Sequence, residues 1–320
     1  MIGVITNDSF LKVADIERAF PEFVNDGEKW KIYPNLDAML EDKDEIEIIL
    51  NAGAIDGEKI KEFKNLKWFA SYSAGVDMYP LGSFKEMGLI LTNSSGVHGK
   101  NISEHVLGVM IMFSRNLIGS FRNQQKKVFD NTIPVSELTG KKLLIVGMGA
   151  IGKAIAQKAK AFDMEVIGIR NRVDKELPEY FDQAYSTKDL DKHLAGKDYI
   201  VSILPATKDT VELFDKSKFD LMDEKTIFMN VGRGNLIVEE DLIEALESKK
   251  IKGAFLDVFP VEPVPAESKL WEIENLFMTS HISGTTDMYF SRAIEIFKKN
   301  YKLYKNGEKM INVIDYNLTY

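Results

Sequence analysis

Short, continuous apolar runs alternate with helical stretches along most of this chain, and this alternation is what most constrains its fold. The clearest runs lie in the second half of the sequence: KLLIVG (142–147), EVIGI (165–169), YIVSIL (199–204), TIFMNV (226–231), GAFLDV (253–258) and LFMTS (276–280). Runs that are apolar throughout, rather than at every second position, are typical of strands buried on both faces of a parallel sheet. Their alternation with helices predicts a doubly wound α/β fold.

A looser series near the N-terminus predicts a second parallel sheet: MIGVI (1–5), IEIIL (46–50), KWFAS (67–71) and LILT (89–92). A chain of 320 residues suits about two domains. Two long helices, predicted at about 101–128 and 287–304, lie where a chain would leave one sheet and return to it. We therefore predict a substrate domain made of 1–100 plus 290–320, with a dinucleotide-binding domain, 101–289, inserted into it.

The charge balance and the absence of cysteine exclude several function classes. With 41 basic and 49 acidic residues the formal net charge is −8, which disfavours nucleic acid or an anionic membrane as the main partner. No run approaches the roughly 18 apolar residues of a membrane helix, and the N-terminus lacks a signal-peptide pattern. Zero cysteines exclude a thiolate metal site, a disulfide scaffold and a cysteine nucleophile, and no HExxH-like spacing occurs. We expect a soluble cytoplasmic protein without a metal site.

A glycine-rich loop follows the first run of the clearer series. The segment LLIVGMGAIGKAIAQKAKAF places Gly147, Gly149 and Gly152 directly after a strand and at the start of a helix, which indicates a dinucleotide-binding turn. Gly147 permits the tight turn, Gly149 lets the backbone approach a pyrophosphate, and Gly152 lets helix and strand pack closely. The helix N-terminus then offers N–H groups and a partial positive charge to the phosphates.

The next run, EVIGIRNR, indicates which dinucleotide to expect. An NAD-binding unit has an acidic residue here that binds the ribose hydroxyls, whereas this chain has Arg170, Asn171 and Arg172. A carboxylate would repel a 2′-phosphate, while a guanidinium binds one bidentately. We predict that NADP(H) is preferred, with Asn171 and Arg172 as direct contacts. The alternative is that the arginines are solvated and the cofactor is NAD(H).

In three later segments, polar residues follow a predicted strand. They supply Arg233 (FMNVGRGNLI), Asp257 and Glu262 (AFLDVFPVEP) and His281 (MTSHISG). Because the carboxyl ends of parallel strands meet at one crevice, these side chains should converge there. Arg233 can clamp the carboxylate of a 2-oxo acid and polarise its carbonyl, and His281 can protonate the carbonyl oxygen as hydride arrives. Glu262 can fix the tautomer of the imidazole and favour its protonated form.

These motifs resemble the D-isomer-specific 2-hydroxyacid dehydrogenase family, and within it an NADP-preferring branch like the glyoxylate and hydroxypyruvate reductases. The matching segments are GMGAIG, SILPATKDT, FMNVGRGNLIVEEDLIEAL, GAFLDVFPVEP, LWEIENLFMTSHISG, SAGVD and NISEHVLGVMIMFSR. The resemblance is dense from about 71 to 300. It implies a Rossmann cofactor domain inserted into a flavodoxin-like substrate domain. Two departures are Ser280, where the family often has proline, and the missing acid after the second strand.

The resemblance assigns roles to matching positions. Arg233, Glu262 and His281 would be the catalytic set, and Asp257 would lie close to the nicotinamide and influence the pH behaviour of the site. The implied cofactor-binding residues are Gly147, Met148, Gly149, Ala150, Ile151, Gly152, Arg170, Asn171, Arg172, Leu204, Pro205, Thr207, Val231, Gly232, Arg233, Asp257, His281 and Gly284.

On the substrate side, the backbone of Ala74, Gly75 and Val76 in SAGVD would receive the substrate carboxylate, together with Arg233 and His281. The long helix from about 101 would form a homodimer. Four residues are candidates either for contact with the substrate side chain or for packing between domains: Tyr72, Lys100, Met288 and Tyr289.

The other histidines have separate interpretations. His98, in a glycine-rich stretch, is a hinge or pocket-rim candidate, and its role stays open. His105, beside Glu104 on the predicted helix, indicates a structural hydrogen bond rather than a ligand role. His193 lies in the charged stretch DLDKHLAGKD and is expected to be solvated.

Other functions on the same scaffold remain to be weighed. Formate or phosphite oxidation needs no proton on a carbonyl oxygen, so Glu262 argues against a formate or phosphite dehydrogenase. A phosphoglycerate dehydrogenase is an alternative, although no regulatory domain follows residue 320. A dinucleotide-sensing, corepressor-like binding protein would retain the Arg–Glu–His set but typically carries long flanking tails.

Overall fold

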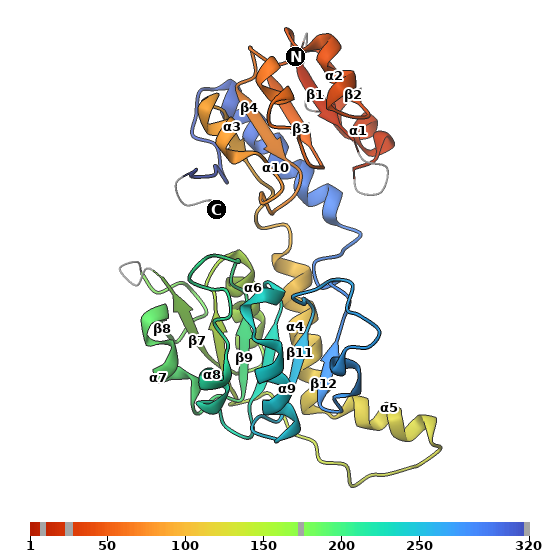
Figure 1. Cartoon of the computed structure of the whole chain (residues 1–320), viewed down its shortest axis with the longest axis vertical. Coiled ribbons are helices and arrows are strands. Elements are labelled where there is room, and N and C mark those ends of the chain that lie inside the picture. Colours follow the sequence, from red (N-terminus) through yellow and green to blue (C-terminus); the bar gives the residue numbers. More distant parts are fainter. Residues whose placement is uncertain (7–10, 23–27, 172–175, 317–320) are drawn as a thin grey trace. The chain divides into compact units, whose positions relative to one another are not determined.

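The chain divides into two compact units in the computed structural model, which describes residues 1–6, 11–22, 28–171 and 176–316 (Figure 1). Unit 1 comprises 1–98 and 286–320, and unit 2 comprises 99–285. Each unit is built on one parallel sheet, so the predicted fold class is confirmed. That unit 1 binds substrate and unit 2 binds the cofactor stays a prediction.

Unit 1 contains a five-stranded sheet with the order β2-β1-β3-β4-β5. All neighbouring strands are parallel, and this order is that of a flavodoxin-like sheet. The strands are β1 (Ile2–Ile5), β2 (Trp30–Tyr33), β3 (Ile48–Asn51), β4 (Trp68–Ser71) and β5 (Ile90–Thr92). Four of them match the predicted runs. The edge strand β2 does not, because three of its four residues are only partly buried or exposed.

Helices cover both faces of this sheet. The first and last helices share a core with one face, and α2 and α3 share a core with the other. The α-helices are α1 (Val13–Ala19), α2 (Leu36–Met39), α3 (Leu81–Glu86) and α10 (Tyr289–Lys305), with 3₁₀ turns η1 (Phe20–Glu22), η2 (Leu40–Asp42) and η3 (Lys59–Glu62). Phe297 of α10 stacks on Phe20 and Trp68, with ring centroids 5.8 and 5.1 Å away. The end of the chain thus completes the core that its beginning starts.

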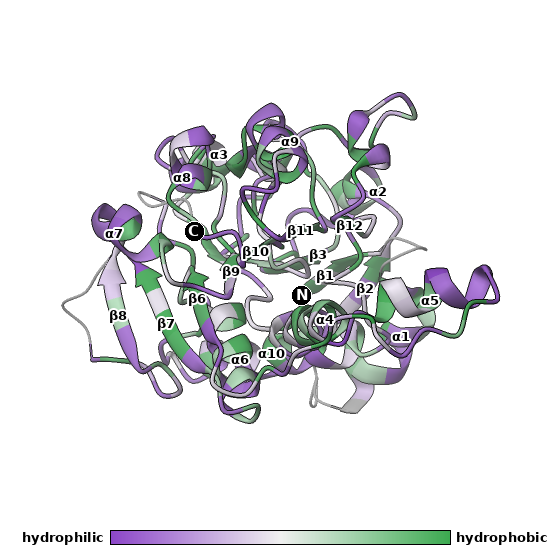
Figure 2. Cartoon of the chain, turned by 90° about the horizontal axis from the view of Figure 1, so that it is seen from below, coloured by the Kyte–Doolittle hydropathy of each residue, from purple (hydrophilic) through white to green (hydrophobic). Residues whose placement is uncertain are grey.

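Unit 2 contains a seven-stranded parallel sheet with the order β12-β11-β10-β9-β6-β7-β8. Six of these strands follow the Rossmann order, which reverses direction between β6 and β9. The strands are β6 (Lys142–Val146), β7 (Glu165–Arg170), β8 (Gln183–Ser186), β9 (Tyr199–Ser202), β10 (Ile227–Asn230), β11 (Gly253–Leu256) and β12 (Leu276–Met278). The edge strand β8 was not predicted. It is mostly hydrophilic, whereas β7 is largely hydrophobic (Figure 2).

Two hydrophobic clusters flank this sheet. The cluster on one face includes α4 and α6, and the cluster on the other face includes α7, α8 and α9. The helices of the unit are α4 (Gly99–Ser114), α5 (Leu117–Gln125), α6 (Ala150–Lys160), α7 (Leu190–Leu194), α8 (Lys216–Asp220) and α9 (Glu239–Glu247), with 3₁₀ turns η4 (Thr187–Asp189), η5 (Gly234–Leu236) and η6 (Lys269–Glu272). No helix in the described ranges is both long and apolar enough to span a bilayer.

The single helix predicted from Asn101 to Val128 is wrong, because α4 ends at Ser114 and α5 begins at Leu117. Asn116 separates them with a left-handed backbone (φ 51°), and its side chain accepts a hydrogen bond from the Gly119 N–H. Asparagine tolerates this conformation and is among the preferred N-cap residues. The apolar pattern continues across the break, which is why periodicity alone did not reveal it.

Candidate active site

The glycine-rich loop joins β6 to α6 with a geometry that demands glycine. Gly147 has a φ of +118°, and a Cβ there would lie 2.8 Å from the carbonyl oxygen of Ile203. A Cβ on Gly152 would lie 2.1 Å from the carbonyl oxygen of Gly147, so any side chain would force the strand and helix apart. At Gly149, by contrast, a Cβ would meet no atom of the described residues within 4 Å. The loop therefore packs closely against its neighbours at Gly147 and Gly152 and leaves open space at Gly149.

This open side faces the start of an 11-residue helix whose N-cap, Gly149, has no side chain to bind the first N–H groups. Such a terminus suits a phosphate. At the carboxyl end of the neighbouring strand β9, the fully buried Ser202 Oγ has no hydrogen-bond partner among the described residues. Buried polar atoms are rarely left without a partner. The tight turn, the uncapped helix and this hydroxyl fit the diphosphate of a dinucleotide.

The end of β7 carries the residues predicted to select the cofactor. Arg170 donates from Nη1 and Nη2 to the carbonyl oxygen of Glu176, both at 3.2 Å. Asn171 is exposed, and its Oδ1 accepts a hydrogen bond of 2.8 Å from Thr187 Oγ1. Arg172 lies outside the described residues. The contact of Thr187 with Asn171 was not predicted, because the two residues lie 16 positions apart in the chain.

The segment predicted to line the adenosine side forms a closed turn after β9. The Thr207 N–H donates to Thr210 Oγ1 at 2.8 Å, and Thr210 Oγ1 donates to the Pro205 carbonyl at 2.6 Å. Leu204 is half-buried and packs against the core of unit 2. Contact of these residues with a cofactor stays a prediction.

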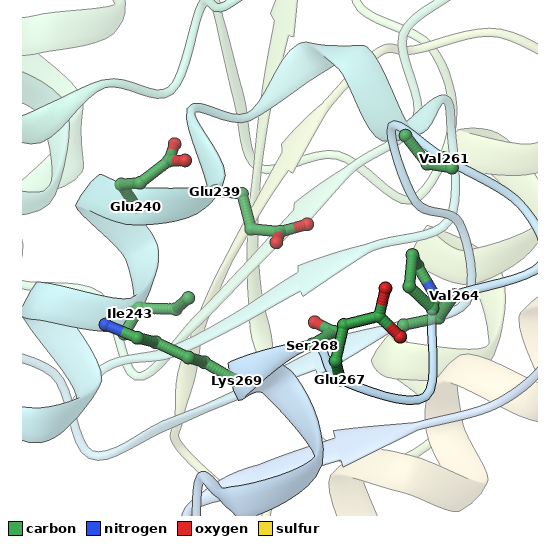
Figure 3. A pocket seen from close by; sticks show the side chains of 9 residues that line it. Glu239, Glu240, Ile243, Val261, Val264, Glu267, Ser268 and Lys269 are labelled. Atoms are coloured by element: carbon green, nitrogen blue, oxygen red, sulfur yellow. The ribbon is translucent and has the colours of Figure 1, made fainter.

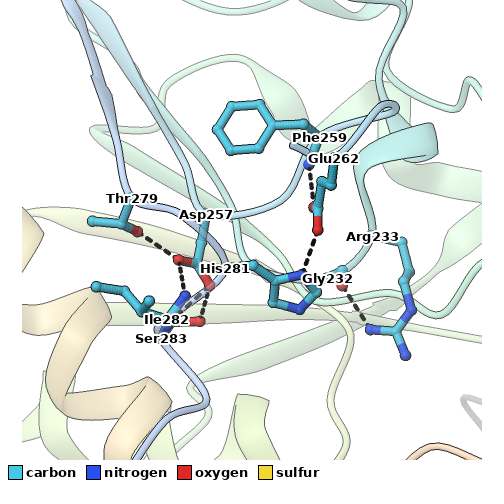
Figure 4. A network of polar contacts seen from close by, with 9 residues as sticks. All are labelled: Gly232, Arg233, Asp257, Phe259, Glu262, Thr279, His281, Ile282 and Ser283. Carbon is cyan, nitrogen blue, oxygen red and sulfur yellow. Dashed lines mark hydrogen bonds and ion pairs between the residues drawn. The ribbon is translucent and has the colours of Figure 1, made fainter. Parts of the chain in front are cut away.

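His281 and Glu262 form the hydrogen-bonded pair that the sequence led us to expect (Figure 4). Glu262 Oε2 lies 2.8 Å from His281 Nδ1, and Glu262 Oε1 accepts a 2.9 Å hydrogen bond from the Phe259 N–H. Because a carboxylate only accepts, Nδ1 carries the hydrogen of this contact. Nε2 is the ring nitrogen that this contact does not use, and the His281 side chain is 53% exposed. Its role in proton transfer stays a prediction.

Arg233 follows β10 in a turn enforced by its neighbours. A Cβ on Gly234 would lie 1.9 Å from the carbonyl carbon of Phe259, and one on Gly232 would lie 2.7 Å from the carbonyl oxygen of Leu204. Asn230 closes the turn, donating from Nδ2 to the Arg233 carbonyl at 2.9 Å and accepting from the Gly232 N–H at 3.1 Å. Asn230 was not predicted; its side chain shapes the site only by binding the backbone of the turn.

The Arg233 side chain is exposed, and its Nη1 donates to the carbonyl oxygen of Gly232 at 2.9 Å (Figure 4). This bond holds one terminal nitrogen of the guanidinium against the turn. The glycines on either side of Arg233 are therefore explained by close backbone approaches rather than by flexibility.

Asp257 is fully buried, and its carboxylate holds the loop that carries His281 (Figure 4). Oδ1 accepts from Thr279 Oγ1 at 2.5 Å and from the Ile282 N–H at 2.9 Å. Oδ2 accepts from the Ser283 N–H at 3.0 Å and also from the Ser283 hydroxyl. Proximity of Asp257 to a nicotinamide stays a prediction, whereas its hold on the loop 279–283 is a feature that sequence reasoning missed.

The backbone of His281 is left-handed, with a φ of 55°. This conformation is uncommon for a residue other than glycine and persists only where the surroundings enforce it. Here the His281 N–H donates to the Asp257 carbonyl oxygen at 2.8 Å, while the Asp257 carboxylate binds the two residues that follow. The loop thus fixes the direction in which the imidazole leaves the backbone.

The predicted carboxylate-binding segment lies in unit 1, directly after β4. Asn93 Nδ2 donates to the Ala74 carbonyl at 2.6 Å and so fixes the segment, a contact that the sequence did not indicate. Nearby, Tyr72 and Tyr289 are buried, and their ring centroids lie 5.2 Å apart. The ring of His98 lies 5.3 Å from that of Tyr289. These three residues therefore form an aromatic cluster within unit 1.

A separate pocket of unit 2 lies between the start of α9 and the segment 261–269 (Figure 3). Glu239, Glu240 and Glu267 line it together with apolar residues such as Ile243 and Val261. Burial, and then the charge of Glu240, raise the pKa of Glu239. None of the predicted site residues lines this pocket.

Unit 2 matches a family model, and known proteins are similar to most of the chain. Residues 107–283 match the family model described as "D-isomer specific 2-hydroxyacid dehydrogenase, NAD binding domain". A hydroxypyruvate reductase of Thermotoga maritima is 30% identical over 285 residues, covering 88% of this chain and 89% of that protein. A D-3-phosphoglycerate dehydrogenase of Archaeoglobus fulgidus is 29% identical over 75% of this chain, which spans only 45% of that longer protein.

Solved structures of similar fold cover nearly all of the chain. A D-isomer specific 2-hydroxyacid dehydrogenase family protein from Aeromonas salmonicida is 33% identical, with a TM-score of 0.84 and 98% of each chain covered. An NADPH-dependent glyoxylate/hydroxypyruvate reductase from Sinorhizobium meliloti, in complex with NADP and sulfate, is 25% identical with a TM-score of 0.82, covering 100% of this chain and 99% of that one.

Proposed function

The chain belongs to the D-isomer-specific 2-hydroxyacid dehydrogenase family, and from that premise we propose that it transfers a hydride between NADP(H) and a small 2-oxo acid or D-2-hydroxy acid. The observation that carries this proposal is the 2.8 Å contact between Glu262 Oε2 and His281 Nδ1. It presents an imidazole whose Nε2 can hold a proton for the substrate.

His281 acts in this proposal as the acid and base of the reaction. In the direction of reduction, Nε2 gives its proton to the carbonyl oxygen, and in the direction of oxidation it takes the hydroxyl proton. Glu262 fixes the ring orientation through Nδ1 and stabilises the charged imidazolium before the transfer. Such acid–base catalysis is worth roughly 10²- to 10⁴-fold in rate. Because formate oxidation needs no such proton, the pair also favours a 2-oxo acid over formate.

Arg233 binds the carboxylate of the substrate in this proposal. A guanidinium presents several N–H donors in a plane, so it can bind a carboxylate through two parallel hydrogen bonds and polarise the adjacent carbonyl. The backbone of Ala74, Gly75 and Val76 is proposed to bind the same carboxylate. The hydrogen bond from Asn93 Nδ2 to the Ala74 carbonyl supports a fixed loop at this position.

NADP(H) is the cofactor that we propose, and when bound it supplies or accepts the hydride. The turn of Gly147, the open space above Gly149 and the uncapped start of α6 would hold its diphosphate. The absence of an acid after β7 favours a 2′-phosphate, with Asn171 as a direct contact. Arg172, outside the described residues, is proposed as the second contact. The Sinorhizobium meliloti reductase named above is NADPH-dependent.

We expect Asn171→Asp to lower kcat/KM for NADPH by about 10- to 100-fold, while leaving that for NADH within about 3-fold. The new carboxylate would repel a 2′-phosphate, and repulsion between close, partly screened charges costs on the order of 1–3 kcal/mol. Aspartate has the shape of asparagine and still accepts the bond from Thr187 Oγ1, so the loop should not move. Steady-state kinetics with both cofactors measure the effect. Asn306→Asp, the same change at the exposed end of α10, is the control. An unchanged NADPH preference in Asn171→Asp would contradict the assignment.

The decisive test of the function is a panel of small 2-oxo acids, including glyoxylate, hydroxypyruvate, pyruvate and branched 2-oxo acids, assayed with NADPH and with NADH. Reduction of at least one acid, with NADPH favoured, is the expected result. Tight cofactor binding without turnover across the panel would instead favour a dinucleotide-sensing binding protein.

We also propose that the chain forms a homodimer through α5 and the segment that follows it. Figure 1 shows both extending away from the rest of unit 2. Large apolar side chains are exposed along this segment: Leu117, Phe121, Val128, Phe129 and Val135. Phe129 is 97% exposed, and apolar patches of this kind mark sites of protein contact. A second copy of the chain is the occupant that symmetric association favours.

The double variant Phe121→Ser/Phe129→Ser is expected to convert the dimer into a monomer, since it removes the two largest exposed apolar side chains of the segment. Multi-angle light scattering at micromolar concentration measures the mass. Phe162→Ser, at an exposed residue just after α6, should leave the mass unchanged. A wild-type protein that is monomeric at high concentration would refute the proposal.

A further inference from the structure

The loop that carries His281 is held from a second side by helix α4. Asn101 Nδ2 donates to the Ser283 carbonyl oxygen at 3.0 Å, and His105 Nε2 lies 3.4 Å from Thr279 Oγ1. Asn101 and His105 are four residues apart, so their side chains lie on the same face of the helix. One face of α4 therefore contacts the loop on both sides of His281.

The direction of the hydrogen bond from His105 follows from the neighbouring carboxylate. Thr279 Oγ1 donates its only proton to Asp257 Oδ1 at 2.5 Å, so it can only accept from His105. His105 Nε2 must therefore carry a hydrogen. Burial lowers the pKa of His105, against a smaller opposing effect from Asp257. The neutral ring then has its single hydrogen on Nε2, directed at Thr279.

The contacts form a continuous chain from the helix to the site. His105 orients the Thr279 hydroxyl, Thr279 binds the Asp257 carboxylate, and Asp257 binds the N–H groups of Ile282 and Ser283. The ring of His105 also lies against Phe255 of β11, with centroids 5.4 Å apart, which fixes its plane. These bonds surround a residue whose left-handed backbone needs enforcement.

We propose that Asn101 and His105 are positioning residues for the hydride-transfer site: they hold the loop 279–283, and through it the imidazole of His281, in the orientation needed for proton transfer. This inference rests on the proposed function. Neither residue touches the reacting atoms in this assignment, so their substitution should lower kcat rather than weaken cofactor binding. Misplacement of a reacting group by about 1 Å can cost on the order of 100-fold in rate.

The test compares two replacements of His105. His105→Phe keeps a ring against Phe255 but removes the donor, and we expect kcat to fall about 10- to 100-fold while KM for NADPH stays within about 2-fold. His105→Gln keeps an amide N–H at similar reach, and kcat should stay within about 3-fold of wild type. Asn101→Leu, which has the same branched arrangement of heavy atoms but no donor, should resemble His105→Phe.

Glu104→Gln is the matched control, because Glu104 lies on the same helix with an exposed side chain whose carboxylate is 3.9 Å from Lys158 Nζ. Its kcat should be unchanged. If His105→Phe retains kcat within 2-fold, the inference is wrong. If His105→Gln is as impaired as His105→Phe while both keep the wild-type melting temperature, the ring matters for packing and the hydrogen-bond role is refuted.

A spectroscopic measurement that does not depend on catalytic activity tests this inference separately from the proposed function. The chain has four histidines, so protein labelled with ¹³C at histidine Cε1 gives four ring signals in a carbon–proton correlation spectrum. We expect His105→Phe to shift or broaden the His281 signal and leave that of His193 in place. An unchanged His281 signal would overturn the inference. Lack of turnover with every 2-oxo acid would refute the proposed function and leave this spectrum to decide the positioning role.

Discussion

The variant His281→Asn is expected to lower kcat for 2-oxo acid reduction by about 10³-fold, within the roughly 10²- to 10⁴-fold range of general acid catalysis. The substitution removes Nε2 and with it the proton that the carbonyl oxygen would receive. The dissociation constant for NADPH should stay within a few-fold, because the turn at Gly147 and the start of α6 are untouched. Single-turnover kinetics and fluorescence titration with NADPH measure the two effects separately.

Asparagine is the most informative replacement at this position because it tolerates the backbone conformation of His281. His281 has a φ of 55°, and asparagine adopts this left-handed region more readily than most residues. The loop also keeps its bonds to Asp257, since these come from Thr279, Ile282 and Ser283. Loss of activity therefore reports the missing imidazole rather than a rearranged loop. His193→Asn, at a histidine stacked on Tyr185 near the edge of the sheet, is the control. A kcat within 10-fold of wild type in His281→Asn would show that another group supplies the proton.

A second large effect is expected for Arg233→Ala, which should lower kcat/KM for the 2-oxo acid by about 10²- to 10³-fold. Two charge-assisted hydrogen bonds to a carboxylate are lost, each worth roughly 1.5–3 kcal/mol and not fully additive. The loss should appear in KM for the acid, through the carboxylate, and in kcat, through the carbonyl that the guanidinium polarises. Affinity for NADPH should change little, because the turn is shaped by Asn230 and the flanking glycines and not by the arginine side chain.

Chemical rescue distinguishes a lost contact from a damaged fold in Arg233→Ala. Added guanidinium ion, at millimolar concentration, should restore part of the activity by binding where the side chain stood, and sodium at the same ionic strength should not. Arg18→Ala, at an exposed side chain on α1 that pairs with Asp15, is the matched control. Full activity of Arg233→Ala without guanidinium would assign carboxylate binding to other groups.

The strands that the sequence predicted lie in continuous apolar runs, and these include the edge strands β5 and β12 with their partly buried residues. The two missed strands, β2 and β8, are edge strands whose partly exposed residues include polar ones, so no apolar run marks them. The break between α4 and α5 was missed because it depends on one residue, Asn116, adopting a left-handed backbone inside an apolar periodicity.

In the candidate site, too, some residues could be predicted from the sequence and others could not. Arg233, Glu262 and His281 could be named because each lies in a short motif directly after a strand. The residues that hold them could not, because their partners are distant in sequence. His105 and Thr279 are 174 residues apart, and Asn101 and Ser283 are 182 apart. Hydrogen bonds of this kind follow from the packing of α4 beside the sheet, which no local pattern encodes.

The discontinuity of unit 1 has a consequence for how the protein is made. Domains fold as units while the chain is synthesised from its N-terminus. Residues 99–285 form one contiguous segment, so unit 2 can close its core before α10 leaves the ribosome. Unit 1 cannot do so, because Phe297 stacks on Trp68 and on Phe20 only once the last helix arrives. The strands of the five-stranded sheet are translated first, but the core on one face of this sheet is completed last. Until α10 arrives, that apolar face is accessible to chaperones.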